Sequence, residues 1–240
     1  MLVAVILCLA SIVSKAFILF HGKDIPVMVL GQNVGNDIKF LDVNANPSPA
    51  AWFSSTLLLL CSGLLAVITS TRKRVGDPHT TYWGALSIIF VLFSLDDGAE
   101  IHDLFIEPLR SLLNTGGLFY FAWVIPGGAF VAIFVLAYTR FLFHLPVKFR
   151  RLFIAAGALY VLGALGMEML GGLQVDLHGE ENLPYLATTT VEEFLEMTGA
   201  ILFLYGLMEY IRHSEEPDEM ISSRQSAMEG TKRQTGSPTK

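Results

Sequence analysis

Apolar residues are gathered into six runs along the chain, separated by segments that are richer in charged, glycine and proline residues. Each run holds about 20 residues, which is the length that an α-helix needs to cross a hydrocarbon core of ~30 Å. We place the runs at about 1–20, 51–71, 82–104, 118–142, 152–174 and 186–211. The pattern predicts an all-α fold, a polytopic transmembrane helical bundle of six spans.

The segments around these runs complete the predicted organisation. No basic residues precede the apolar stretch of the first run, which favours a transmembrane helix over a signal peptide. Residues 22–50 are rich in Gly, Pro, Asn and Asp, as is typical of a loop. Residues 214–240 hold few large apolar side chains and are expected to be disordered. We therefore expect a six-span domain over 1–213, with an outer loop at 22–50, followed by a solvated tail.

The composition supports a membrane protein and excludes other classes. Hydrophobic residues make up 52% of the chain and charged residues only 16%, with a mean hydropathy of +0.53, whereas soluble domains carry about 25% charged residues. The net charge of −6 argues against a nucleic-acid partner, which needs a basic surface. Both cysteines lie inside apolar runs, so we expect neither a structural disulfide nor a cysteine metal cluster.

The basic residues predict the orientation of the spans. Twelve of the 16 Lys and Arg residues follow the second, fourth and sixth runs, in three clusters that share one side of the six-span topology. Because short loops rich in Lys and Arg stay in the cytoplasm, this side should be cytoplasmic. The sequence thus predicts a multi-pass protein of the plasma (inner) membrane with both termini in the cytoplasm.

Acidic residues form a layer inside three of the predicted spans. They occur in SLDDGAEIHD (94–103), GMEMLGG (166–172) and TTTVEEFLEMTG (188–199). At 1.5 Å per residue, Asp97, Glu168 and Glu196 each lie roughly 24–25 Å from the basic end of their span. The third, fifth and sixth spans should therefore be neighbours, because only their mutual packing hides these carboxylates from lipid.

The spacing within each segment suggests how the acids converge. Asp96, Glu100 and Asp103 are spaced i, i+4 and i+7, which places them on one face of an uninterrupted helix. Glu192 and Glu193 precede Glu196 by four and three residues, so either one shares its face. The neighbouring glycines permit close helix approach and are Gly166, Gly171, Gly172 and Gly199.

This acidic layer predicts a cation site. An ionised carboxylate within a bilayer costs on the order of 2.5–3.5 kcal/mol, and several close together repel one another. A shared divalent cation or bound protons would relieve both costs. His102 adds an imidazole, and mixed carboxylate and imidazole ligands suit Zn, Mn or Fe, whereas carboxylates alone also suit Ca or Mg. The predicted metal ligands are Asp96, Asp97, Glu100, His102, Glu168, Glu193 and Glu196.

The acidic segments also carry a resemblance. SLDDGAEIHD and VEEFLEMTGA occur together with NPSPAAWFSS, which opens the second span. Over about residues 40–212, this combination is similar to small uncharacterised bacterial membrane proteins with six spans and acidic intramembrane motifs. The resemblance implies that the acidic segments act as a unit, and it implies no named activity. The chain contains no HExxH, GxSxG or P-loop motif.

Three functions fit these observations. Cation- or proton-coupled transport is favoured by intramembrane carboxylates and by Pro126-Gly127-Gly128, which would form a hinge in the fourth span. A metal-dependent enzyme acting on a lipid or another outer-leaflet substrate is the alternative, in which the ion activates water. A third is a cation-stabilised subunit or sensor of a complex. The expected partners are the lipid bilayer and either a small cation or a lipid-like substrate, while the oligomeric state stays open.

Overall fold

The computed structural model describes residues 1–10, 28–29, 32–33, 49–180 and 182–235. Within these residues the protein is helical, apart from a two-residue antiparallel pair of strands, β1 (Met28–Val29) and β2 (Gln32–Asn33). This pair falls in the predicted outer loop, whose last two residues already belong to a helix; the other residues of that loop lie outside the described ones. Residues 2–10 form a helix at the start of the first predicted span, whose second half is likewise not described.

Five helical segments are long and apolar enough to cross a membrane. They are α3 (Pro49–Arg74), α4 (Thr80–Ala99), α6 (Val124–His144), the continuous segment Val147–His178, and residues Leu183–Ser214 of α9 (Leu183–Thr235). The continuous segment comprises α7 (Val147–Val161), the π-helical stretch η3 (Leu162–Met167) and α8 (Glu168–His178). A membrane-type helical fold is thus confirmed for five of the six predicted runs.

Small side chains set the pairing of these helices. Ser62 and Ser87 join α3 to α4, with the Ser62 hydroxyl donating to the Ser87 carbonyl at 2.8 Å. Ser55 and Ser94 make the same contact nearer the start of α3, with 2.7 Å between the Ser55 hydroxyl and the Ser94 carbonyl. Hydroxyls that bond across helices, and small residues that permit close approach, are the usual means of helix association in lipid.

The fifth and sixth predicted spans also pack against each other. A Cβ at Gly199 of α9 would lie 2.8 Å from the Ala156 carbonyl oxygen and 2.8 Å from the Tyr160 nitrogen of α7. A Cβ at Gly163 of η3 would lie 2.8 Å from Cγ of Glu196. The two backbones are therefore close enough to exclude any side chain at these two positions, and Gly199 has the role that the sequence predicts.

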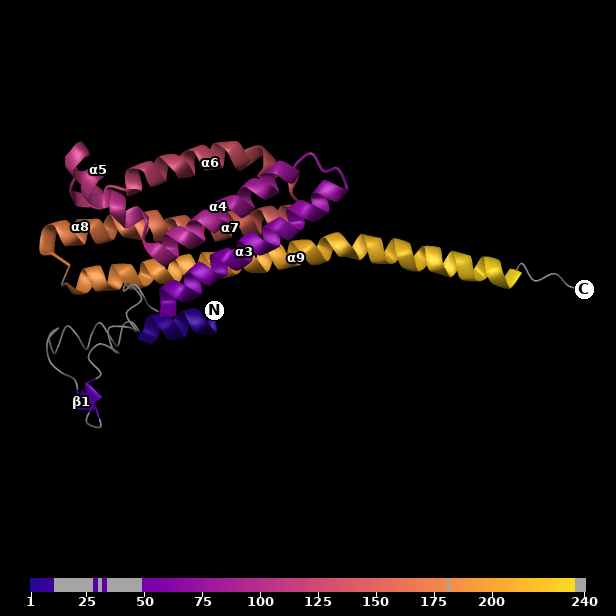
Figure 1. Ribbon diagram of the computed structural model, residues 1–240, viewed down its shortest axis with the longest axis horizontal. Coiled ribbons are helices and arrows are strands. Elements are labelled where there is room, and N and C mark those ends of the chain that lie inside the picture. The colour runs from indigo at the N-terminus through magenta and orange to yellow at the C-terminus, as the bar shows by residue number, and fades with distance from the viewer. Residues whose placement is uncertain (11–27, 30–31, 34–48, 181, 236–240) are drawn as a thin grey trace, which may run out of the picture.

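The third predicted span contacts the other two through aromatic rings. Phe93 of α4 stacks on Tyr160 of α7 at 6.1 Å, and Phe90 stacks on Phe203 of α9 at 4.7 Å between ring centroids. Its closest backbone neighbour is α3 rather than α7 or α9, as Figure 1 shows. The three acidic spans are neighbours as predicted, but the third contacts the other two through side chains rather than by close backbone packing.

Two predicted spans differ from the structure. The run 82–104 is not one helix, because α4 ends at Ala99 and Glu100 takes a left-handed conformation with φ 48°. Asp96, Glu100 and Asp103 therefore do not share a helical face. The fourth span begins only at Val124, so Pro126 occupies the first turn of α6, where a missing backbone N–H costs nothing. The predicted hinge at Pro126-Gly127-Gly128 is wrong for this reason.

The predicted tail differs as well. The structure continues α9 as a helix to Thr235, and Figure 1 shows this part projecting beyond the bundle. Between Pro217 and Pro238 the sequence contains no proline and consists mainly of residues that a helix accommodates. A composition with few large apolar residues predicts the lack of a packed core, and it does not exclude a helix.

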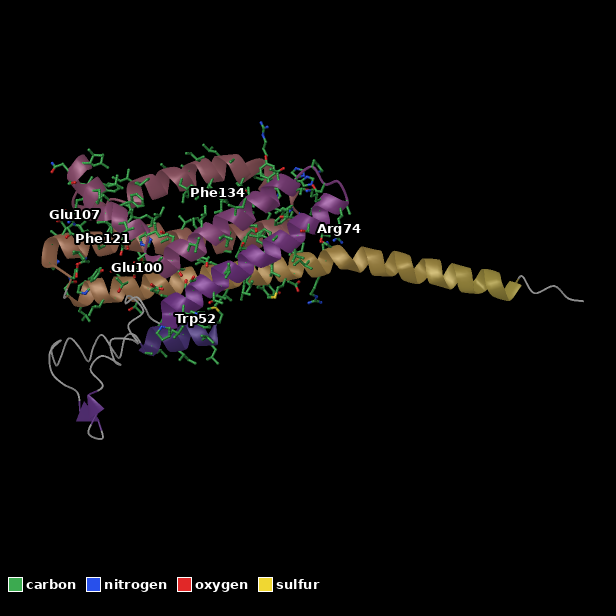
Figure 2. All side chains as sticks on the ribbon, in the orientation of Figure 1. Trp52, Arg74, Glu100, Glu107, Phe121 and Phe134 are labelled. Atoms are coloured by element: carbon green, nitrogen blue, oxygen red, sulfur yellow. The ribbon has the colours of Figure 1, made fainter. Side chains whose placement is uncertain are left out.

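The two ends of the bundle carry opposite charge. Arg74 lies at one end, whereas Glu100 and Glu107 lie at the other (Figure 2). At the first end, which we call the basic end, Arg72 donates to the Ser214 hydroxyl at 2.9 Å and Lys148 pairs with Glu209 at 2.8 Å. The opposite end, which contains Glu100 and Glu107, is called the acidic end.

This polarity makes the topology testable. Reporter fusions after residues 75, 147 and 240 should report the cytoplasm, and fusions after 35, 114 and 180 should report the opposite side, because the basic end should stay in the cytoplasm. A reversed result at any two sites would contradict both the orientation and the six-span count.

Candidate functional site

A polar cavity of about 540 Å³ opens at the acidic end, between the end of α4, α5 (Ile106–Leu113), the start of α8 and the start of α9. All seven residues predicted as metal ligands line it. Four further acids line it as well: Asp103, Glu107, Glu180 and Glu192. The structure thus brings together residues that are up to 100 positions apart in the sequence, at the level that span depth predicts.

The end of α4 is folded back on itself by its own side chains. After the left-handed turn at Glu100, the 3₁₀ turn η1 (His102–Phe105) returns the chain towards Asp96. The backbone N–H of His102 donates to Asp96 Oδ1 at 2.8 Å, and His102 Nδ1 lies 2.9 Å from Asp96 Oδ2. A non-glycine residue in a left-handed conformation costs on the order of 1–3 kcal/mol, and this double contact offsets it. The turn holds His102 at the rim of the cavity.

His102 lies among carboxylates. Burial lowers the pKa of His102, but the hydrogen bond and charge of Asp96, together with the charges of Asp103 and Glu168, more than offset it. The pKa of His102 consequently lies above its ordinary value, and the imidazolium is favoured beside Asp96. The second ring nitrogen, Nε2, lies 3.4 Å from Asp103 Oδ1, so both ring nitrogens face carboxylates.

An indole links the first acidic segment to the second. Trp123 Nε1 donates to Glu168 Oε1 at 2.9 Å, and its ring lies 4.6 Å from the His102 ring between centroids. Glu168 follows directly on the π-helical stretch η3, and such stretches occur frequently at functional sites. Trp123 is not among the site residues that the sequence predicts. Its only signal is an aromatic residue near the acidic end of the fourth span.

The third acidic segment reaches Glu168 through close packing. A Cβ at Gly163 would lie 2.9 Å from the Glu192 carbonyl oxygen, so η3 and α9 run in contact at this level. Glu192 and Glu168 lie within hydrogen-bond reach of each other. Two carboxyl groups can share a hydrogen bond only when one of them carries a proton. Without a proton or a cation between them, Glu168 and Glu192 repel each other.

Two carboxylate oxygens in this cavity are buried without compensation. Among the described residues, neither Glu192 Oε2 nor Asp97 Oδ2 has a hydrogen-bond partner. The other Asp97 oxygen accepts only a long bond of 3.5 Å from the Ser54 hydroxyl. An unsatisfied buried polar atom costs about 1–3 kcal/mol, and more when the group is charged. Spacing alone leaves Glu192 and Glu193 as equivalent partners of Glu196, and Glu192, which is not among the predicted ligands, has the unpartnered oxygen in the described part of the chain.

Among the described residues, one arginine lines this cavity, and it lies at the rim. Arg110 lines the cavity, but its guanidinium pairs with Glu107 and lies 4.2 Å above the Tyr120 ring, at the rim. The cavity therefore combines ten carboxyl groups with one arginine and one histidine. Such a surplus attracts cations from the solvent that meets the acidic end.

The side chains are not gathered around a single point. Within the described ranges, no three His, Cys, Asp or Glu residues are grouped so that they could hold a metal ion. The acids instead surround a volume much larger than one ion. His178 closes α8 and is not among the lining residues, and His21 lies outside the described part of the chain.

Comparison with known proteins identifies the family. Residues 1–210 match a family model described as a domain of unknown function, DUF8692. Because the match covers most of the chain, the protein belongs to this family. No curated protein and no solved structure matches the chain. Family membership agrees with the resemblance to uncharacterised membrane proteins, and the family description names no activity.

Proposed function

We propose that this DUF8692 protein is an integral membrane protein that binds a cation in the carboxylate cavity at its acidic end, as the first step of cation- or proton-coupled transport. The observation that carries the proposal is the pair of buried, unpartnered oxygens, Asp97 Oδ2 and Glu192 Oε2, in a cavity of ten acids. Removing the repulsion among these acids provides the free energy of binding.

A hydrated divalent cation fits this cavity best. Mg²⁺-like ions keep several water molecules and need only one or two direct carboxylate ligands. A volume of about 540 Å³ accommodates such an ion with its water, which is consistent with side chains that do not converge on one point. The metal identity is left open between Mg, Ca, Mn and Zn, since carboxylates accept all four.

The shared proton between Glu168 and Glu192 supplies the coupling. A cation that binds to these carboxylates competes with the proton, so binding should release protons to the solvent. Exchange of a cation for protons is the elementary step of coupled transport. The transport cycle also needs a passage from this cavity to the basic end, which the other state of the cycle would have to open.

Ion binding should be measured on the purified protein. Titration with Mg²⁺, Ca²⁺, Mn²⁺ or Zn²⁺ should raise the melting temperature as the free ion concentration rises. The free energy of unfolding should gain about 2.7 kcal/mol at a hundredfold excess of ion over the dissociation constant. Glu168→Gln should weaken this stabilisation. Glu209→Gln is the control, because it makes the same change at the basic end.

Flux separates the two functions. In liposomes with an imposed pH gradient, ion uptake that depends on Glu168 supports coupled transport. Ion binding without flux, but with turnover of a lipid, supports the metal-dependent membrane enzyme. The exposed apolar side chains of Leu104, Phe105 and Leu112 favour this alternative, because they offer a contact with the membrane surface. If no ion shifts the melting curve, bound protons alone account for the acidic layer.

A further inference from the structure

A second cavity, of about 480 Å³, lies between α4, α6, α7 and α9. Its lining is apolar except for the hydroxyls of Tyr138, Tyr160 and Thr139 and the guanidinium of Arg150. It shares no lining residue with the carboxylate cavity, so an inference about it does not rest on the proposed function.

The cavity exists because α6 stands away from the rest of the bundle, as Figure 1 shows. Rings bridge the gap: Phe130 meets Phe93 at 6.0 Å between centroids, and the Tyr138 hydroxyl donates to the Tyr82 carbonyl at 3.0 Å. Phe134, labelled in Figure 2, lines the space from the middle of α6. Protein interiors hold few voids larger than a water molecule, and a large apolar cavity takes an apolar occupant.

The described part of the chain does not supply this occupant. The N-terminal helix packs elsewhere, with Ala4 and Cys8 against Phe53 and Met197. In a bilayer, the apolar molecule at hand for a cavity among spanning helices is a lipid chain.

Arg150 indicates which kind of lipid. It lines the cavity at the basic end, and its guanidinium carbon lies 5.0 Å above the Phe143 ring. In the described residues this guanidinium has no carboxylate partner, whereas the nearby Lys148 is paired with Glu209. A basic side chain between helices at the predicted cytoplasmic side is the common recognition element for a lipid phosphate, and Arg is suited to it by its fork of donors.

We propose that the cavity between α4, α6, α7 and α9 binds one acyl chain of a phospholipid whose phosphate pairs with Arg150. The chain lies along the aromatic lining, and the headgroup lies at the basic end. The lipid completes the packing of α6, which the protein's own side chains leave unfinished.

Two glycines offer a matched test of the acyl-chain site. Gly157 lines the cavity, and a Cβ there would meet nothing within 4 Å, so the side chain of Gly157→Leu should enter the cavity and occupy part of the acyl-chain path. Gly63 is equally open but lies on α3 outside the cavity, which makes Gly63→Leu the control. Native mass spectrometry from mild detergent should find one phospholipid per chain in the wild type and in Gly63→Leu, and none in Gly157→Leu. Arg150→Gln should retain lipid about tenfold more weakly, as expected for a lost charge-assisted pair.

Photo-cross-linking from a lipid tests the acyl-chain site even if Gly157→Leu fails to fold. Wild-type protein in vesicles that contain phosphatidylglycerol with a diazirine in one acyl chain should label the cavity-lining parts of α6 and α7. Equal lipid retention in both leucine variants, or no label on α6 and α7, would overturn the proposal. Cross-links between two protein chains at Phe134 would also overturn it, because they would assign the cavity to a second copy.

Discussion

Glu192→Gln is expected to raise the thermal stability of the ion-free protein while it removes the stabilisation by ions. In the wild type, Glu192 Oε2 is buried without a partner, and Glu168, Glu193 and Glu196 add like charge around it. An amide carries no charge and offers an N–H donor to Glu168, so both costs fall. The expected gain in the free energy of unfolding is about 1–3 kcal/mol, the cost of an unsatisfied buried group.

This result would separate a binding site from a structural network. The measurement is thermal unfolding in detergent at neutral pH, first with a chelator and then with increasing free divalent ion. Glu209→Gln, on the same helix at the basic end, should lose a little stability, because it gives up exposed pairs with Lys148 and Arg212. A Glu192→Gln variant that is destabilised in chelator would mean that the carboxylate is already compensated, which contradicts the proposed cation site.

The same substitution, Gly→Ala, should have opposite effects at two glycines. Gly199→Ala is expected to destabilise the protein by about 1–3 kcal/mol, because its Cβ would lie 2.8 Å from the backbone of Ala156 and Tyr160. Gly63→Ala should stabilise it by about 0.5–1 kcal/mol, since alanine is the better helix residue and the site is open.

Chemical unfolding in mixed micelles would measure both variants. A loss of stability at Gly199 should also weaken ion binding, because contact between α7 and α9 is what places Glu192 and Glu196 beside Glu168. Changes of the same sign at the two glycines would show that α7 and α9 are not in backbone contact.

Much of the architecture could be predicted from the pattern of apolar residues. A bilayer of fixed thickness requires about 20 apolar residues in each spanning helix, so runs such as 51–71 and 186–211 are visible without any tertiary information. The depth of an acid within its run follows from the rise of the helix in the same way. For this reason Asp97, Glu168 and Glu196 could be assigned to one layer, and the structure brings them to one cavity.

The details of the site could not be predicted in this way. The end of α4 at Ala99 depends on contacts of Asp96 with His102, six residues further on, and an apolar run contains no signal for it. The contact of Trp123 with Glu168 joins two spans, and Gly163 lies opposite Glu192 only because η3 packs on α9. The same holds for the cavity lined by Arg150, which no pattern in the chain predicts.

The sequence by itself determined the helical class, the five helices that are long and apolar enough to span a membrane, the polarity of the two ends and the shared position of the acids along their helices. These properties depend on the solvent around each helix, which acts on one residue at a time through its hydrophobicity and charge. The tertiary structure alone decided which carboxylate oxygens are left without partners, where α4 stops and where cavities lie. Those properties depend on distances between side chains of different helices, and such distances are set by packing at the scale of single methyl groups.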